Sequence, residues 1–216
     1  MKKYLLIFIG AFIFAQMHAA TAFQRDSLPV NDSAIIGYAT SNFYKGTPEG
    51  NLGDLVADAM LNTPIPNQEN LDKISLLAPQ SIKGDLSKGE IYFKTIQALL
   101  PYNDSLFLYE ISGKNLIFLF NKVAQKGGMP CAGFSFAIEN MNAQNILINS
   151  MPIDSGKKYF LITTQYTMKV LNLQMVFAAM PLNRSIQEAV SDFIIRKTKN
   201  GKPVFGYKQK RIYYKN

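Results

Sequence analysis

The spacing of apolar residues along the chain predicts several amphipathic helices. In these segments apolar side chains recur three and four positions apart, which places them on one face of a helix. The first segment begins at Asn51, which we expect to be its N-cap, and another follows Ser112, a second capping residue. Pro101 ends a shorter segment because proline cannot continue a helix. The predicted helices cover residues 51–60, 92–100, 112–125 and 185–198.

Short apolar and alternating runs between these segments predict strands. In residues 105–111, the even-numbered and the odd-numbered positions both carry mostly apolar side chains, and these two sets point to opposite faces of a strand. We therefore expect a strand that is covered on both faces for most of its length. Residues 171–180 fit either a short helix or a buried loop, and a final edge strand is expected near the C-terminus. The predicted strands cover residues 34–39, 73–78, 105–111, 134–139, 146–149, 159–164 and 211–214. This irregular alternation predicts the α+β class, as a single mixed α/β domain.

The N-terminal residues have the pattern of a secretory signal peptide. Lys2 and Lys3 precede an apolar run at 4–15, and small residues with an A-x-A pattern follow. We predict cleavage after residue 22, an extended lead-in over 23–33 and one domain over 34–216. No cysteine follows the apolar run to accept a lipid, so we expect an exported protein, periplasmic or secreted, without a membrane anchor.

The formal charge of +8 favours anionic partners. Removal of Lys2 and Lys3 with the signal peptide lowers this charge by two, and the remainder is still basic. Nucleotides, phosphorylated sugars and nucleic acid are all anions that a basic protein could bind. A role in solubility alone would explain the positive charge equally well. No pattern indicates binding to a specific nucleic acid.

Histidine and cysteine usage excludes several kinds of site. The one histidine, His18, lies in the predicted signal peptide, so residues 23–216 cannot form a Ser-His-Asp or Cys-His pair or a His-rich dimetal centre. Cys131 is the one cysteine, which leaves no internal disulfide and suggests a buried spare thiol. Glycine-rich nucleotide fingerprints are absent from the sequence. We therefore predict no catalytic residue, no metal site and no cofactor for this chain alone.

Several local motifs occur in an order that matches one known family. The strongest is N-L-G-D-L-V-A-D-A-M at 51–60, similar to an N-L-G-x-L-x-x-D-A helix. Residues 74–83 resemble a strand that runs into an N-G-G-x-I-R loop, and residues 89–104 resemble G-x-I followed by P-F-G-N. Residues 110–116 and 152–164 resemble the later L-x-G-x-x-L and P-L-D…K-Y…A-T motifs. Together these motifs resemble the C-terminal, substrate-binding domain of the 5'-nucleotidase family.

This resemblance implies that catalysis and substrate binding belong to different domains. In two-domain members of the family, an N-terminal metallophosphatase domain carries two metals and a catalytic Asp-His pair, and the C-terminal domain grips the nucleotide. The resemblance therefore implies a nucleotide- or nucleoside-recognition module for nucleotide catabolism. Because the chain has no histidine beyond residue 18, it would work with a metallophosphatase made as a separate chain.

The resemblance also assigns base-recognition residues. The family stacks the base between two aromatic rings, and Tyr102 and Tyr166 occupy those places here. Stacking needs a π-face and does not depend on whether the ring is Phe or Tyr. Asp104 stands where the family has an asparagine that meets the base, so the amide donor is replaced by a carboxyl group.

Charged and backbone contacts are carried over in the same way. Lys83 replaces the arginine of the N-G-G-x-I-R loop, and it keeps the charge without the two-pronged guanidinium. Lys45 lies near a second family arginine. Gly127 matches a family backbone contact, and Asn172 falls at the distance of a family aspartate.

Two other interpretations are consistent with the sequence. In one, the fold is degenerate and serves as a structural or interaction protein without a small ligand. In the other, the chain is a basic exported protein that binds an acidic polymer or a membrane surface, with steep salt dependence and no base preference. Occlusion of the space between Tyr102 and Tyr166 would favour the first of these alternatives.

Overall fold

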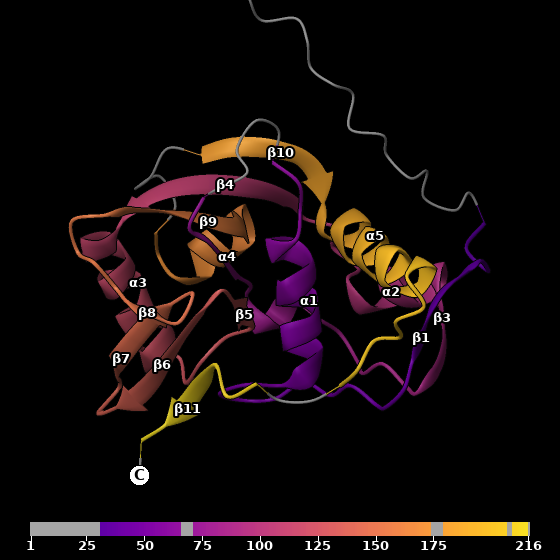
Figure 1. Ribbon diagram of the computed structural model, residues 1–216, viewed down its shortest axis with the longest axis horizontal. Coiled ribbons are helices and arrows are strands. Elements are labelled where there is room, and N and C mark those ends of the chain that lie inside the picture. The colour runs from indigo at the N-terminus through magenta and orange to yellow at the C-terminus, as the bar shows by residue number, and fades with distance from the viewer. Residues whose placement is uncertain (1–30, 66–70, 174–178, 207–208, 216) are drawn as a thin grey trace, which may run out of the picture.

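A five-stranded mixed sheet organises the computed structural model, which describes residues 31–65, 71–173, 179–206 and 209–215 (Figure 1). The predicted signal peptide and most of the predicted lead-in lie outside these residues. β9 and β2 run parallel, and the other neighbouring pairs are antiparallel. No described helix has the length and hydropathy needed to cross a bilayer. In spatial order the strands are β10 (Ala179–Ser185), β4 (Ser105–Ser112), β9 (Lys158–Thr164), β2 (Lys73–Leu76) and β5 (Cys131–Ala132).

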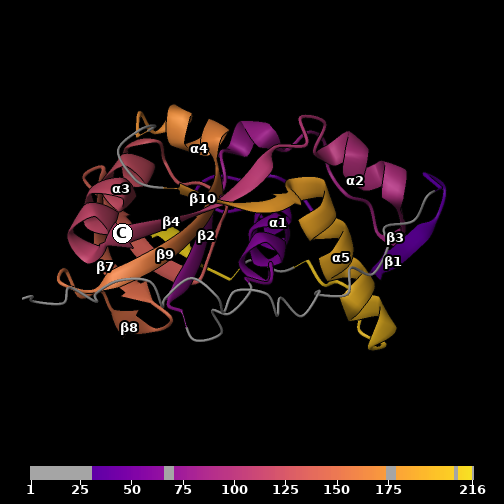
Figure 2. The same ribbon diagram turned by 90° about the horizontal axis from the view of Figure 1, so that it is seen from above.

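Helices cover both faces of this sheet (Figure 2). One hydrophobic core joins Leu106 and Leu108 of β4 to α1 (Asn51–Leu61), α2 (Phe93–Leu99) and α5 (Ile186–Lys199). The alternate β4 residues, including Tyr109 and Ile111, face a second core that contains residues of α3 (Gly113–Gln125) and α4 (Gln165–Val170). The two-faced burial predicted for this strand is thus confirmed, because successive side chains of a strand point to opposite faces.

Two smaller sheets and one short turn complete the fold. The second core also receives a four-stranded sheet, ordered β11 (Ile212–Tyr214), β6 (Phe134–Glu139), β7 (Asn142–Ile148) and β8 (Met151–Pro152). A two-stranded sheet pairs β1 (Ile35–Ala39) with β3 (Gly89–Tyr92). A 3₁₀ turn, η1 (Pro79–Ser81), follows β2. The α+β class predicted from the sequence is confirmed.

The predicted helices are all present, with one correction at a cap. Ser112 caps α3 as expected, since its hydroxyl accepts a hydrogen bond from the Asn115 N–H at 3.3 Å. Asn51 is the first residue of α1 and not its N-cap, a position that Gly50 occupies. The Asn51 side chain instead accepts a hydrogen bond from the Tyr44 N–H, so it secures the preceding loop. The unpredicted elements include β3, α4 and β10, while residues 174–178, part of the ambiguous 171–180 segment, lie outside the described residues.

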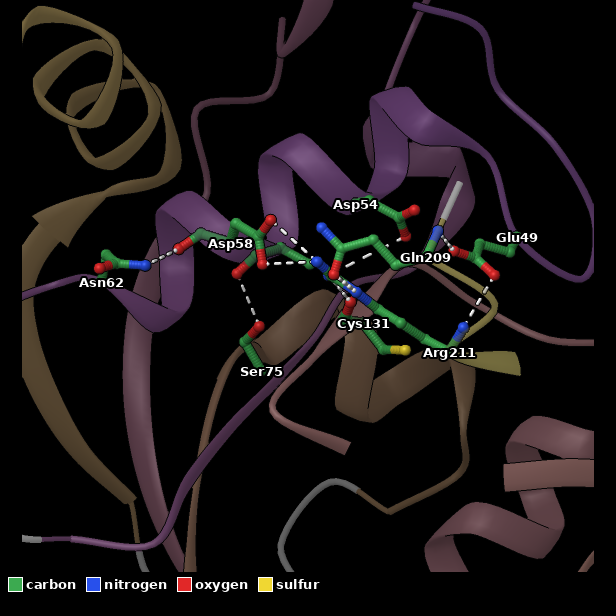
Figure 3. A network of polar contacts seen from close by, with 9 residues as sticks. Glu49, Asp54, Asp58, Asn62, Ser75, Cys131, Gln209 and Arg211 are labelled. Atoms are coloured by element: carbon green, nitrogen blue, oxygen red, sulfur yellow. Dashed lines mark hydrogen bonds and ion pairs between the residues drawn. The ribbon is translucent and has the colours of Figure 1, made fainter. Parts of the chain in front are cut away.

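Arg211 fastens the C-terminal segment to α1 (Figure 3). Its side chain is only 9% exposed, and its Nη2 donates to both carboxylate oxygens of Asp58, at 2.8 and 2.9 Å. Nη1 donates to the carbonyl oxygen of Cys131, and Nε donates to Oε1 of Gln209 at 3.1 Å. The carboxylate of Glu49 accepts hydrogen bonds from the main-chain N–H groups of Gln209 and Arg211, at 2.6 and 2.9 Å. Each nitrogen of the guanidinium donates to an acceptor, which is what a buried charge requires.

The Arg211 pair makes a testable contribution to stability. We expect Arg211→Met to lower the free energy of unfolding by about 3 kcal/mol, because it leaves the Cys131 carbonyl and the Asp58 carboxylate without their donor. Urea denaturation followed by circular dichroism measures this loss. Lys215→Met is the control: it removes an exposed pair with Glu139, whose side chains are 48% and 39% exposed, and should cost less than about 1 kcal/mol. Equal losses in the two variants would contradict the assignment.

Candidate functional site

Lys83 and Tyr102 lie in direct contact at the surface. Lys83 follows the 3₁₀ turn, and its main-chain N–H donates to the Leu99 carbonyl oxygen at 2.8 Å, which ties the loop to the last residue of α2. Its ammonium nitrogen is 5.5 Å from the centroid of the Tyr102 ring. This is within the range of a cation–π interaction. Tyr102 is 60% exposed, so much of its ring is open to a ligand.

Local hydrogen bonds fix the turn that carries Tyr102. Pro101 ends α2, and Asn103 takes a left-handed conformation with φ of 47°, with its N–H directed at the Leu100 carbonyl oxygen at 3.1 Å. The carbonyl oxygen of Asp104 accepts from the Ile186 N–H at 2.9 Å, which joins the turn to the first residue of α5. Partial burial raises the pKa of Asp104 above its usual value. Asp104 therefore follows Tyr102 in a turn that is anchored at both ends.

Tyr166 is the second residue of α4, and this helix is hydrogen-bonded to the segment that carries Lys83. Thr164 caps this helix by accepting a hydrogen bond from the Thr167 N–H at 3.1 Å. The Thr167 hydroxyl in turn accepts from the Ala78 N–H at 3.0 Å. Segment 78–83 is thus hydrogen-bonded to α4 at one end and to α2 at the other. These two helices pack in the cores on opposite faces of the five-stranded sheet, and both lie along the upper edge of the view in Figure 2. The two predicted stacking residues belong to the helix and the turn that this segment connects.

Lys45 adjoins this region through a neighbouring loop. Its main-chain N–H donates to the Asp85 carboxylate at 3.3 Å, and Asp85 follows Lys83 closely in the chain. Lys45 is exposed.

Asn172 follows α4 in a left-handed conformation with φ of 56°, and its side chain is also exposed. The chain immediately beyond, residues 174–178, lies outside the described residues.

Gly127 lies away from these residues, at a concavity beyond the end of α3. It has φ of +80°, a conformation that favours glycine, and a Cβ added there would lie 3.3 Å from the Tyr214 hydroxyl and 3.5 Å from Cγ2 of Thr47. The concavity measures about 550 Å³ and is open to solvent. Its wall also includes Met141 and Lys215. The structure therefore places Gly127 beside the C-terminal strand and gives it no described contact with Tyr102.

A buried acidic cluster was not anticipated as a chemical feature. Asp54 is 3% exposed, and burial, followed by a hydrogen bond with Glu49, raises its pKa to about 8. Burial also raises the pKa of the Cys131 thiol well above its usual value, and the expected buried thiol is confirmed. The sequence contains one indication of this cluster, the spacing of Asp54 and Asp58, because residues four apart lie on the same face of a helix. Among the described residues, no group of three or more His, Cys, Asp or Glu is arranged to hold a metal ion.

Comparisons with known proteins agree on the fold. No curated protein sequence matches the chain. The structure is similar to the 5'-nucleotidase precursor of Thermus thermophilus, with a TM-score of 0.69 and 19% identity, and the match covers 84% of this chain and 39% of that one. It is also similar to the NAD nucleotidase of Haemophilus influenzae, with a TM-score of 0.66, 14% identity, and coverage of 86% and 39%. The sulfate thiohydrolase of Thermus thermophilus, in complex with glycerol, matches with a TM-score of 0.65, 14% identity, and coverage of 85% and 36%.

These structural neighbours establish the fold alone, because all three share less than a fifth of their residues with this chain. The chain corresponds to well under half of the length of each neighbour. The sequence profile described as "5'-nucleotidase, C-terminal domain" matches residues 34–178, which is most of the chain. The chain therefore belongs to the 5'-nucleotidase C-terminal domain family.

Proposed function

We propose that this domain recognises a nucleoside or nucleotide by stacking its base between Tyr102 and Tyr166. The observation that carries the proposal is segment 78–83, which is hydrogen-bonded to the start of α4 and to the end of α2, next to the two tyrosines. Both rings are accessible, at 60% and 39% exposure, as stacking requires. The membership of the chain in a nucleotidase family supports a nucleotide-type ligand.

Lys83 supplies the charge for an anionic ligand. Its ammonium lies 5.5 Å from the Tyr102 ring centroid, so a base on the open part of that ring would have the cation beside it. A lysine attracts phosphate as a point charge and lacks the paired donors of an arginine. Lys45, Asp104 and Asn172 remain proposed contacts of this ligand, and Gly127 remains a proposed backbone contact at the concavity beyond α3. Of these, Asp104 is the nearest in sequence to the stacking ring and offers a carboxyl group to a base amine.

We further propose that phosphate hydrolysis takes place on a metallophosphatase supplied as a separate chain. Residues 23–216 contain no histidine, and the similar nucleotidases are much longer than the matched region. Carboxylates and lysines alone do not form the usual dimetal phosphoesterase centre. The predicted signal peptide supports a meeting of the two chains outside the cytoplasm, in nucleotide catabolism.

Calorimetric titration tests the stacking residues. The chain is titrated with adenosine, AMP and a UDP-sugar, and the measurement is repeated on Tyr102→Ala and Tyr166→Ala. Since one stacked base is worth about 1–3 kcal/mol, each variant should weaken binding roughly 5- to 150-fold. Tyr102→Phe keeps the π-face and should bind within a few-fold of the wild type.

Tyr38→Ala is the matched control for surface tyrosine loss. Tyr38 is 46% exposed and lies on β1, in the small two-stranded sheet. Its removal should leave binding unchanged. Saturable binding that survives both stacking variants would contradict the proposed site, and absence of binding to all three ligands would support the ligand-free alternative.

A second titration tests the charge at residue 83. Lys83→Met should weaken AMP binding roughly 10- to 150-fold, because a hydrogen bond to a charged group contributes about 1.5–3 kcal/mol, and should change adenosine binding much less. Lys83→Arg should retain or improve AMP binding. Lys88→Met removes another exposed lysine of the same loop and serves as the control. Equal effects of Lys83→Met on AMP and adenosine would show that the charge does not contact phosphate.

A further inference from the structure

Residues 209–215, here named the C-terminal strap, are held at three places. Glu49 accepts the N–H groups of Gln209 and Arg211, and Asp58 accepts the Arg211 guanidinium. β11 then pairs in parallel with β6, at the edge of the four-stranded sheet. The strap ends beside the open concavity, to which it contributes Tyr214 and Lys215. Its position therefore determines part of the wall next to Gly127.

The first two attachments surround Asp54, which has an unusual environment (Figure 3). The titratable groups that face it are Glu49 from the preceding loop, Asp58 from α1, Arg211 from the strap and Cys131 from β5. Arg211 is the one cation among three carboxyl groups in this set. Its Nη1 is 4.0 Å from Oδ1 of Asp54, too far for a hydrogen bond.

The arrangement of Asp54 and Glu49 indicates that the two carboxyl groups share one proton. Oδ2 of Asp54 is buried and receives no hydrogen bond from any described residue. A hydrogen bond with the Glu49 side chain is, after burial, the second cause that raises the pKa of Asp54. Two carboxyl groups can hydrogen-bond to each other only when one of them carries a proton, because two carboxylates are both acceptors. The arrangement therefore calls for one bound proton.

We propose that the C-terminal strap is a proton-dependent latch, which the proton shared by Asp54 and Glu49 keeps closed and whose opening removes Tyr214 and Lys215 from the concavity beside Gly127. Loss of the proton places a second buried negative charge beside Glu49, the residue that holds the strap through two main-chain N–H groups. Opening relieves the desolvation of this charge, because water reaches Asp54 once the strap is lifted. This gain exceeds the attraction to Arg211 that opening removes, since burial is the largest cause of the raised pKa and Arg211 only partly offsets it.

The direction of the pH dependence follows from the two states of Asp54. In the closed strap its pKa is raised from 3.8 to about 8, and in the open strap hydration returns the pKa toward its ordinary value. The closed state therefore binds the proton more tightly and is favoured at low pH. By linkage, the opening equilibrium rises by up to about tenfold per pH unit between about pH 4 and pH 8 and is constant above that range.

Limited trypsin digestion measures the opening, because the strap contains cleavable bonds after Lys210 and Arg211. The full chain is digested at pH 6 and pH 8, together with Asp54→Asn. Asparagine is close to aspartate in size, donates a hydrogen bond to Glu49 at any pH and cannot ionise. The rate of strap cleavage in the wild type, divided by that in Asp54→Asn, should rise roughly 10- to 100-fold from pH 6 to pH 8. This ratio cancels the pH dependence of trypsin itself.

Hydrogen exchange on the wild type keeps the proposal testable if Asp54→Asn does not fold. After correction for intrinsic exchange, the amides of the strap should lose protection between pH 5 and pH 8, while those of α3 keep theirs. A constant cleavage ratio, or strap protection that does not change with pH, would overturn the proposal. Loss of protection in α3 in parallel with the strap would also overturn it, because that result describes global unfolding and not a latch.

Discussion

The ion pair between the buried Arg211 and the partly buried Asp58 joins the two sides of the structure. Asp58 belongs to α1, whose apolar residues pack in the core on one face of the five-stranded sheet, while Ile212 next to Arg211 packs in the core on the other face. Arg211 reaches across at β5, where it donates to the Cys131 carbonyl oxygen. A buried pair offsets its desolvation only when its remaining donors are satisfied, and here Gln209 and Cys131 satisfy them. Arg211 thereby attaches residues 209–211 to α1.

The elements that the sequence predicts are those with local causes. The amphipathic period places α3 and α5, and their caps depend on residues within one turn, Ser112 for α3 and the Ser185–Glu188 capping box for α5. The two-faced β4 was predictable because its apolar residues occupy both alternating sets. The turn at Tyr102 was equally accessible to prediction, since Pro101 can only end the preceding helix.

The features that the sequence does not predict have distant causes. β10 contains Pro181 and has no alternating apolar pattern, and it is a strand because it pairs with β4, far away in the chain. α4 is short, and its N-cap Thr164 gains its role partly through Thr167, which also binds Ala78. Asn51 is an ordinary capping residue by type, yet its side chain is committed to the Tyr44 N–H, so Gly50 takes the cap position. The environment of Asp54 is likewise made by residues that are brought together only in the folded chain.

The loop over residues 44–50 connects the candidate ligand site to the strap. Near its start, Lys45 binds Asp85 beside the loop of Lys83, and near its end Glu49 holds the strap. The loop is compact because Gly50 packs on it: a Cβ at residue 50 would lie 2.2 Å from the main-chain nitrogen of Gly46. A side chain at that position would have to push the two ends of the loop apart. Glycine at position 50 thus allows the segment that carries Lys45 and the segment that carries Glu49 to pack closely against each other.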